Sequence, residues 1–121
     1  MQEDHVGRAL IQWLEAVLET DVPNLYTHTP AQVAYPYGEF SLSEVKKNPG
    51  EKRVAVQFSV TLFSQYRGQK ELLEISAKVR SKIENNREGI GVFRLKSINY
   101  KQENDNITRK SELEFMGLIS V

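Results

Sequence analysis

The sequence predicts an α+β fold: a mostly antiparallel sheet of about four to five strands with two helices packed on one face. Two segments place apolar residues at three- and four-residue intervals, as the buried face of a helix requires. Other segments alternate apolar and polar residues and are joined by turn-forming residues, as antiparallel strands are. Along the chain the elements read helix, short strand, hairpin, helix, hairpin.

Length and composition are those of a small soluble domain. The 121 residues suffice for one core, so we expect one domain over 1–121. Hydrophobic residues make up 40% and charged residues 26%, which argues against disorder. No apolar run reaches the roughly 18 residues that a membrane span needs. The acidic start, residues 1–5, does not resemble a secretory signal, so we expect synthesis in the cytoplasm and no membrane partner.

The cysteine and histidine content predicts neither disulfide bonds nor a metal site. The chain has no cysteine, which excludes disulfides and thiolate metal sites. The two histidines, His5 and His28, lie far apart and lack the spacing of metal ligands. The residue types therefore predict neither a disulfide nor a histidine or thiolate metal site.

Residues 6–19 are predicted to form the first helix. Asp4 is a candidate N-terminal cap, and Pro23 lies just beyond the end. Trp13 is expected in the core. The apolar residues that recur at helical spacing are Val6, Leu10, Trp13, Leu14, Val17 and Leu18.

Residues 21–38 are rich in turn formers and contain a short predicted strand at 25–27. The run Tyr35-Pro36-Tyr37 leads into a second strand over 37–45, and it is either a packed corner or a contact patch. Pro49-Gly50 then marks the tip of a charged hairpin, because this dipeptide is a strong turn signal.

The clearest strand covers 53–66, where apolar side chains alternate with smaller or polar ones. This is longer than the roughly 5–6 residues of a typical strand. We therefore expect it to reach beyond its own core and contact something else.

The second half of the chain completes the sheet. Gly68 precedes a second predicted helix over 69–85, which Asn85-Asn86 ends. A strand is predicted over 92–100, where the alternation is less clean and one face would hold Val92, Arg94, Lys96 and Ile98. A turn at 103–106 and a last strand over 108–120 follow. In that last strand one face holds Leu113, Phe115, Gly117 and Ile119.

Charge is balanced overall but uneven along the chain. Residues 1–45 hold seven acidic and one basic residue, a net charge of −6, and residues 46–101 hold thirteen basic and five acidic, a net of +8. Residues 102–121 hold two basic and four acidic, a net of −2. Segments of opposite sign suit head-to-tail contact between copies. The alternative is that folding mixes these segments over the surface.

Motifs of catalysis are absent from the sequence, and we predict that the protein is not an enzyme. There is no Gly-rich phosphate loop, nucleophile elbow or His-Glu-x-x-His run. Glu112 and Glu114 share one face of a strand, where paired carboxylates are more often solvated than catalytic. The alternative, a small-ligand-binding or enzymatic α+β domain, has only His28, Tyr35 and Arg94 as scattered candidates.

The strongest candidate contact residues are basic. Lys46, Lys47, Lys52 and Arg53 cluster on the predicted hairpin, where they contact an acidic partner or nucleic-acid backbone, or simply keep the tip soluble. No aromatic residues interleave with them to stack bases, so a dedicated nucleic-acid binder is disfavoured. Tyr66 and Arg67 join the long strand to the second helix and are types enriched at interfaces.

Three stretches of this sequence carry a family resemblance. They are the corner Tyr35-Pro36-Tyr37, the strand-to-helix run over 56–71, and the closing strand over 111–119. In order and spacing, over nearly the whole chain, the sequence resembles the tail terminator proteins of siphophages, prophages and gene transfer agents. This family is also called tail completion or tail-to-head joining proteins.

The resemblance implies a structural role without catalysis or cofactor. It implies a homo-oligomeric ring, usually a hexamer, that caps the last ring of tail tube protein, ends tube growth and meets the head connector. DNA passes through the lumen without sequence-specific binding. Assembly is then expected in the host cytoplasm, and the final location is the virion tail. A closed ring needs two different complementary patches on each subunit.

Overall fold

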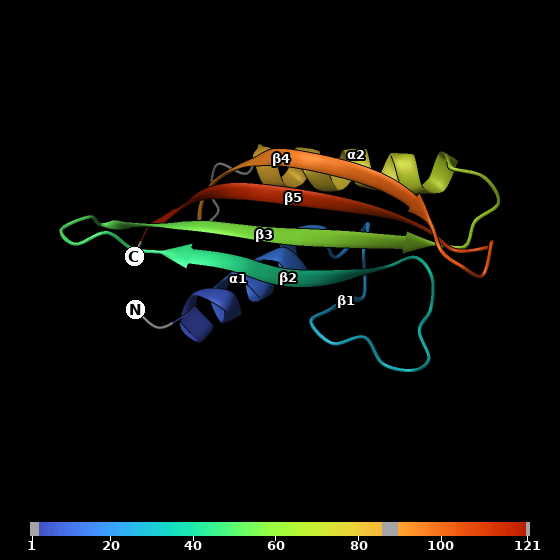
Figure 1. Cartoon of the computed structure of the whole chain (residues 1–121), viewed down its shortest axis with the longest axis horizontal. Coiled ribbons are helices and arrows are strands. Elements are labelled where there is room, and N and C mark those ends of the chain that lie inside the picture. The colour runs from blue at the N-terminus through green and yellow to red at the C-terminus, as the bar shows by residue number, and fades with distance from the viewer. Residues whose placement is uncertain (1–2, 86–89, 121) are drawn as a thin grey trace.

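The computed structural model of the protein describes residues 3–85 and 90–120. Within these ranges the chain forms two helices and five strands, and the strands lie in one sheet (Figure 1). The elements are α1 (Glu3–Leu18), β1 (Leu25–Tyr26), β2 (Tyr37–Lys46), β3 (Arg53–Ser64), α2 (Lys70–Glu84), β4 (Gly91–Gln102) and β5 (Arg109–Ser120).

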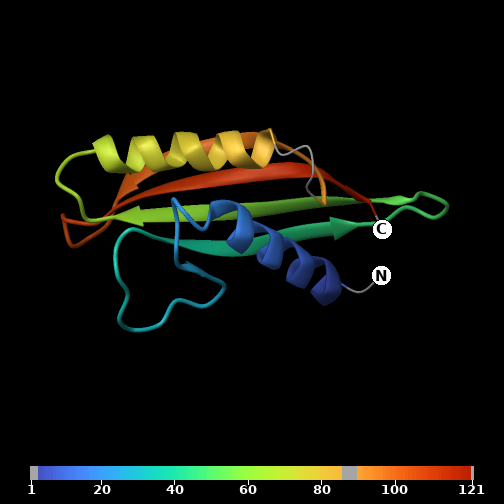
Figure 2. The ribbon, with the colours of Figure 1, turned by 180° about the vertical axis from the view of Figure 1, so that it is seen from behind.

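The strand order across the sheet is β1-β2-β3-β5-β4. The two-residue β1 pairs with β2 in parallel, and the other neighbours are antiparallel. Both helices lie on the same side of the sheet, as the view from behind shows (Figure 2). The predicted fold class, a mostly antiparallel sheet with two helices on one face, is confirmed.

The core lies between the helices and the sheet face that they cover. The first helix buries Val6, Leu10, Leu14 and Leu18, and the second buries Leu72, Val79 and Ile83. Phe58 of β3 lies at the centre, with ring centroids 5.8, 5.4 and 5.4 Å from those of Phe40, Phe93 and Phe115. Burial of such aromatic side chains supplies much of the stabilisation in a domain of this size.

Two predictions about single elements are corrected, and two are confirmed. The first helix already includes Glu3, so Asp4 lies inside it and cannot be the cap, which requires non-helical backbone. The expected core position of Trp13 is confirmed: the residue is partly buried and packs against the core, with its ring centroid 5.0 Å from that of Phe93. Strand β3 ends at Ser64 and is paired with β5 along its whole length, so it does not extend past the sheet. The predicted end of the second helix is confirmed at Asn85, which is the C-terminal cap of α2, and Asn86 lies outside the described residues.

A β-bulge between Leu95 and Ser97 changes which side chains of β4 face the helices. Val92 and Arg94 point to the uncovered face, but the extra residue shifts the register, so Ile98 pairs with Leu113 and packs against the core. The predicted single series from Val92 to Ile98 is therefore wrong at Ile98. The backbone N–H of Leu95 donates to a carboxylate oxygen of Glu84 on α2, at 2.7 Å.

The uncovered face of the sheet, which we call the open face, carries an aromatic corner at one end. Tyr37 stacks on Phe63 with ring centroids 4.7 Å apart, and Tyr26 and Tyr35 pack against Tyr37. Burial, together with the neighbouring Tyr35 and acidic side chains, raises the pKa of Tyr37 to about 12. The Tyr35-Pro36-Tyr37 run is thus a packed corner, although the Tyr35 ring stays partly exposed.

Candidate assembly interface

The six predicted contact residues fall at opposite ends of the sheet. Lys46, Lys47, Lys52 and Arg53 belong to the β2–β3 hairpin at the left of Figure 1, which we call the hairpin end. Tyr66 and Arg67 belong to the loop between β3 and α2 at the right. With this loop, the β4–β5 turn over 103–108 forms what we call the loop end. The twelve residues of β3 separate the two ends by about 36 Å.

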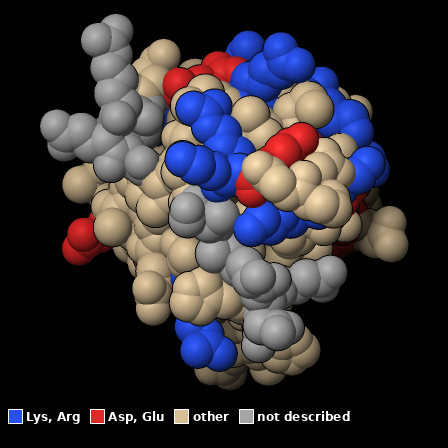
Figure 3. Space-filling model, turned by 90° about the vertical axis from the view of Figure 1, so that its left-hand side faces the viewer, with Lys and Arg blue, Asp and Glu red and all other residues tan. Residues whose placement is uncertain are grey.

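The hairpin places its four cations in solvent. Gly50 takes a positive φ of 83°, and the Glu51 N–H donates to the Asn48 carbonyl at 3.2 Å, which closes the tip. All four basic side chains are exposed, and none forms an ion pair with a described residue. Figure 3 looks onto this end and shows Lys and Arg gathered over it with fewer Asp and Glu among them.

The loop that carries Tyr66 and Arg67 is held by polar contacts while both side chains point outward. The Tyr66 N–H donates to Ser64 Oγ at 3.1 Å, and that hydroxyl donates to the Glu71 carboxylate at 2.6 Å. Gly68 has a φ of 81°, a left-handed conformation that glycine adopts without strain. Tyr66 keeps 57% of its surface exposed, so the fold itself does not use this ring.

Folding mixes the acidic and basic segments in part. Asp21, from the acidic first segment, pairs with Lys82 at 2.6 Å and lies 3.9 Å from Lys78, both from the basic segment. These contacts neutralise charge beside the helices but leave the hairpin cations without a described acidic partner. Folding therefore brings acidic and basic segments together near the helices, whereas the hairpin end remains basic.

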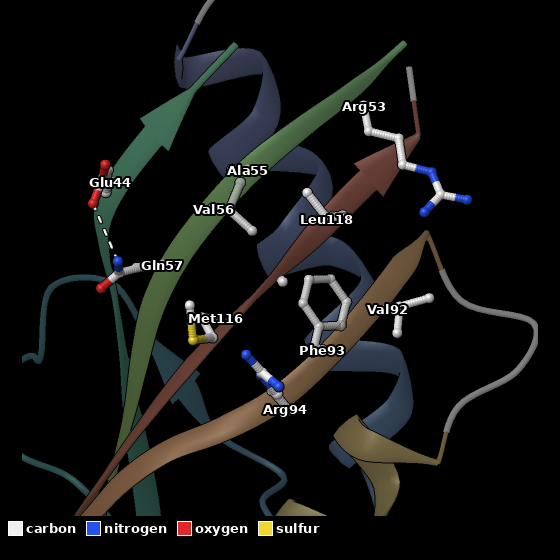
Figure 4. Close-up of a pocket in the computed structure, with 11 residues that line it drawn as sticks. Glu44, Arg53, Ala55, Val56, Gln57, Val92, Phe93, Arg94, Met116 and Leu118 are labelled. Atoms are coloured by element: carbon white, nitrogen blue, oxygen red, sulfur yellow. Dashed lines mark hydrogen bonds between the residues drawn. The ribbon is translucent and has the colours of Figure 1, made fainter. Parts of the chain in front are cut away.

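A shallow hollow of ≈ 430 Å³ lies on the open face at the hairpin end (Figure 4). Apolar side chains from three neighbouring strands form its floor, and Val92 and Leu118 keep 70% and 40% of their surface exposed. Arg53, Arg94 and Glu44 stand at its rim. The floor consists of Ala55, Val92, Met116 and Leu118.

Polar side chains bound the hollow toward the middle of the sheet. The Gln57 amide donates to the Glu44 carboxylate at 3.2 Å, and the Lys96 ammonium donates to the Gln57 amide oxygen at 3.3 Å. Beyond this row the open face is mainly polar. There the Glu112 carboxylate forms an ion pair with the Lys101 ammonium at 2.9 Å, and this ammonium holds the pKa of the carboxyl below its usual range.

Residues proposed for an enzymatic reading are not brought together. His28 and Tyr35 lie in the segment between β1 and β2, whereas Arg94 lies on β4 beside the hollow. Glu114 is exposed and its neighbour Glu112 is engaged by Lys101. No group of three side chains suited to metal binding occurs in the described part of the chain. Over that same part, no helix combines the length and apolar character of a membrane span.

Sequence reasoning missed Val92 and Leu118, although a signal was present. Both alternate with buried neighbours, Phe93 and Ile119, so they had to lie on the opposite face of the sheet. What the pattern did not reveal is that β4 and β5 are adjacent and place these two side chains opposite each other.

Comparison with solved structures gives an informative match. No protein-family model and no curated protein sequence matches the chain. Among solved structures, a chain from the virion of a native gene transfer agent particle has the same fold, with a TM-score of 0.70 at 14% sequence identity. The match covers 94% of this chain and 93% of that one.

A second match is partial. A structure from Akkermansia muciniphila, described without its transmembrane region, has a TM-score of 0.39 and 10% identity, over 66% of this chain and 44% of the other. A similarity this weak carries no argument about the present chain.

Proposed function

We propose that this chain is a structural subunit of a phage-like particle and, more narrowly, a tail terminator domain over 1–121. The observation that carries the proposal is the match to a gene transfer agent virion chain along nearly the full length of both chains. A shared fold alone does not fix function. The sequence resemblance over 35–37, 56–71 and 111–119 points independently to the same kind of particle.

In this role the chain forms a homo-oligomeric ring, with six copies as the family resemblance implies. The ring caps the tail tube protein, ends tube growth and presents a surface to the head connector. DNA crosses the lumen without sequence-specific contacts. The protein acts without catalysis, assembles in the host cytoplasm and remains in the virion tail.

The distribution of contact residues supports a ring. A closed ring of identical subunits uses heterologous contacts, in which one patch of each copy meets a different patch of the next. The basic hairpin end and the exposed Tyr66 and Arg67 at the loop end are two such different patches. They lie at opposite ends of one sheet, so a copy can use both at once.

Rings are tested directly by mass and by imaging. We expect light scattering over a concentration series, with negative-stain microscopy of the same fractions, to show rings of the chain alone or after addition of purified tail tubes. Rings on tube ends, with tubes that no longer elongate, are the expected outcome. A chain that stays monomeric and leaves tube growth unchanged would exclude the terminator role.

The hairpin cations are tested by charge reversal. Replacing Lys46, Lys47 and Lys52 by glutamate is expected to weaken assembly while the fold persists, because these side chains are exposed and make no described ion pair. The pair Lys47→Glu and Lys78→Glu separates location from charge, since Lys78 lies on α2 with 63% of its side chain exposed and only a long 3.9 Å contact to Asp21, and Asp21 keeps its closer partner Lys82. Equal assembly of these two variants would remove the hairpin from the interface.

The second candidate, a small-ligand-binding or enzymatic domain, depends on the same hollow. Its volume of ≈ 430 Å³ falls in the range of small-molecule sites. Such sites bury about 70–90% of the ligand surface, whereas Val92 on the floor is itself 70% exposed. An open, apolar floor with a charged rim fits a protein contact better than an enclosed ligand.

A further inference from the structure

The hollow at the hairpin end is not explained by folding. Its floor side chains Val92, Met116 and Leu118 point away from the helices, so they add nothing to the core beneath. Exposed aliphatic side chains gathered on one patch, with charged groups around them, are typical of surfaces that another protein covers. The hollow therefore calls for an apolar occupant with acidic character, because Arg53 and Arg94 stand at its rim.

At the loop end, the β4–β5 turn presents an isoleucine in the same unexplained way. Ile107 keeps 60% of its surface exposed at a turn that is otherwise polar. Its backbone is fixed: the N–H groups of Ile107 and Thr108 donate to Asp105 Oδ1 at 2.9 and 2.8 Å. The Thr108 hydroxyl donates to Asp105 Oδ2 at 2.6 Å, and Asn106 has a positive φ of 60°.

The same contacts keep a negative charge beside Ile107. The hydroxyl of Thr108 and the backbone N–H groups of Thr108 and Ile107 hold the pKa of Asp105 below its usual range, so the carboxylate is ionised near neutrality. The turn is also tied to the neighbouring loop, since the Gln65 amide donates to Thr108 Oγ1 at 3.0 Å. A turn fixed in this way loses little conformational entropy when it docks.

The two surfaces match in chemistry. The turn offers one aliphatic side chain next to a carboxylate, and the hollow offers an aliphatic floor next to two guanidinium groups. The loop end also carries the exposed Arg67, and the rim also carries Glu44, so each sign of charge on one surface has its opposite on the other.

We propose that the β4–β5 turn of one copy inserts Ile107 into the hollow of the next copy, with Asp105 directed toward Arg53 and Arg94. The inference rests on the proposed function, in which copies of the chain assemble, and it names the contact between them. Because the turn and the hollow lie at opposite ends of the sheet, the contact is head-to-tail. A linear oligomer therefore has one unoccupied turn at one end and one unoccupied hollow at the other, and closure into a ring brings these two together.

Engineered disulfides test this contact, since the chain has no cysteine of its own. The double variant Ile107→Cys/Val92→Cys is expected to give a ladder of covalent oligomers on non-reducing gels after mild oxidation. A mixture of the two single variants should stop at dimers, because each single-cysteine chain has one reactive end. The matched control is Leu73→Cys/Val92→Cys, in which Leu73 is an exposed apolar residue on α2 outside both surfaces.

Each outcome decides something. A ladder with the Ile107/Val92 pair and none with the control supports the contact, whereas no ladder, or an equal ladder in the control, overturns it. If the wild-type chain forms rings but the Ile107→Cys/Val92→Cys variant does not cross-link, the terminator proposal stands and the proposed contact is wrong. If the variant gives a ladder but the protein neither forms rings nor caps tubes, the contact is supported and the terminator proposal is wrong.

Discussion

The covered and open faces of this one sheet differ in what determines their residues. On the covered face, Phe58, Leu113 and Phe115 are almost fully buried under the helices. On the open face, the residues between them along the same strands, such as Ser59 and Glu114, are polar and reach solvent. The covered face is explained by the hydrophobic effect alone. The apolar hollow on the open face is not, which is why we propose it as a contact surface.

The largest expected effect separates the two faces at adjacent positions. Phe58→Ala should lower the free energy of unfolding by about 3–5 kcal/mol, because it removes a buried ring and leaves a cavity. Ser59→Ala, one residue on, should change it by no more than about 0.5 kcal/mol. Urea unfolding measures both. A Phe58→Ala variant as stable as Ser59→Ala would break the comparison.

A smaller effect is expected at Gly117, where β5 has no room for a side chain beside β4. A Cβ at Gly117 would collide with the Val92 carbonyl oxygen and the Phe93 ring, so Gly117→Ala should cost about 1–3 kcal/mol of unfolding free energy. The control is Gly7→Ala in α1, where the nearest atom would be Leu42 Cδ2 at 3.4 Å. This helical change should stabilise by about 0.5–1 kcal/mol. Thermal unfolding distinguishes the two signs.

The stability of the contact between α2 and β4 is expected to depend on pH, because it includes the Glu84 carboxylate. Burial works against its charged form, but the Leu95 N–H and the Arg80 guanidinium outweigh burial and lower the pKa of this carboxyl. The unfolded chain therefore takes up the proton first, so the stability Glu84 adds is present at neutral pH and is lost as pH falls through the folded pKa. Glu84→Gln should cost about 1 kcal/mol at neutral pH.

The measurement for this prediction is the unfolding free energy of wild type and variant over a pH series. The difference between them should shrink toward zero in acid. A difference that grows as pH falls would contradict the assigned sign.

The smallest effect on stability is expected on the open face itself. Val92→Ser and Leu118→Ser should each change the unfolding free energy by no more than about 0.5 kcal/mol, because both side chains are exposed. If the hollow is an interface, the same variants lose assembly in light scattering. Normal assembly of both variants would contradict the proposal that the hollow is an interface.

Much of the fold was predictable because its signals are local. Both helices and the strands around Phe58 and Phe115 follow periodic patterns that one buried face imposes, and their observed ends lie within a few residues of the predicted ones. The order of strands was not predictable, since placing β5 between β3 and β4 depends on contacts distant in sequence. The bulge between Leu95 and Ser97 was likewise not predicted; there the Leu95 N–H donates to Glu84 of α2, a contact that no periodic pattern specifies.

The candidate site was predictable only in part. The hairpin cations were identified because Pro49-Gly50 fixes the tip and the basic residues flank it. Their separation from Tyr66 by the full length of β3 follows from the sequence once that strand is accepted. The hollow needed the structure, since Val92 and Leu118 come from strands whose pairing no local pattern specifies.

The bulge in β4 also affects solubility. An unpaired outer strand presents backbone groups that other chains can extend by strand addition, a common route to aggregation. Here the Leu95 N–H is already used by Glu84, and the bulge interrupts the regular spacing that an incoming strand would need. The edge is thereby divided into two short stretches, so we expect little strand addition between copies of the chain at this edge.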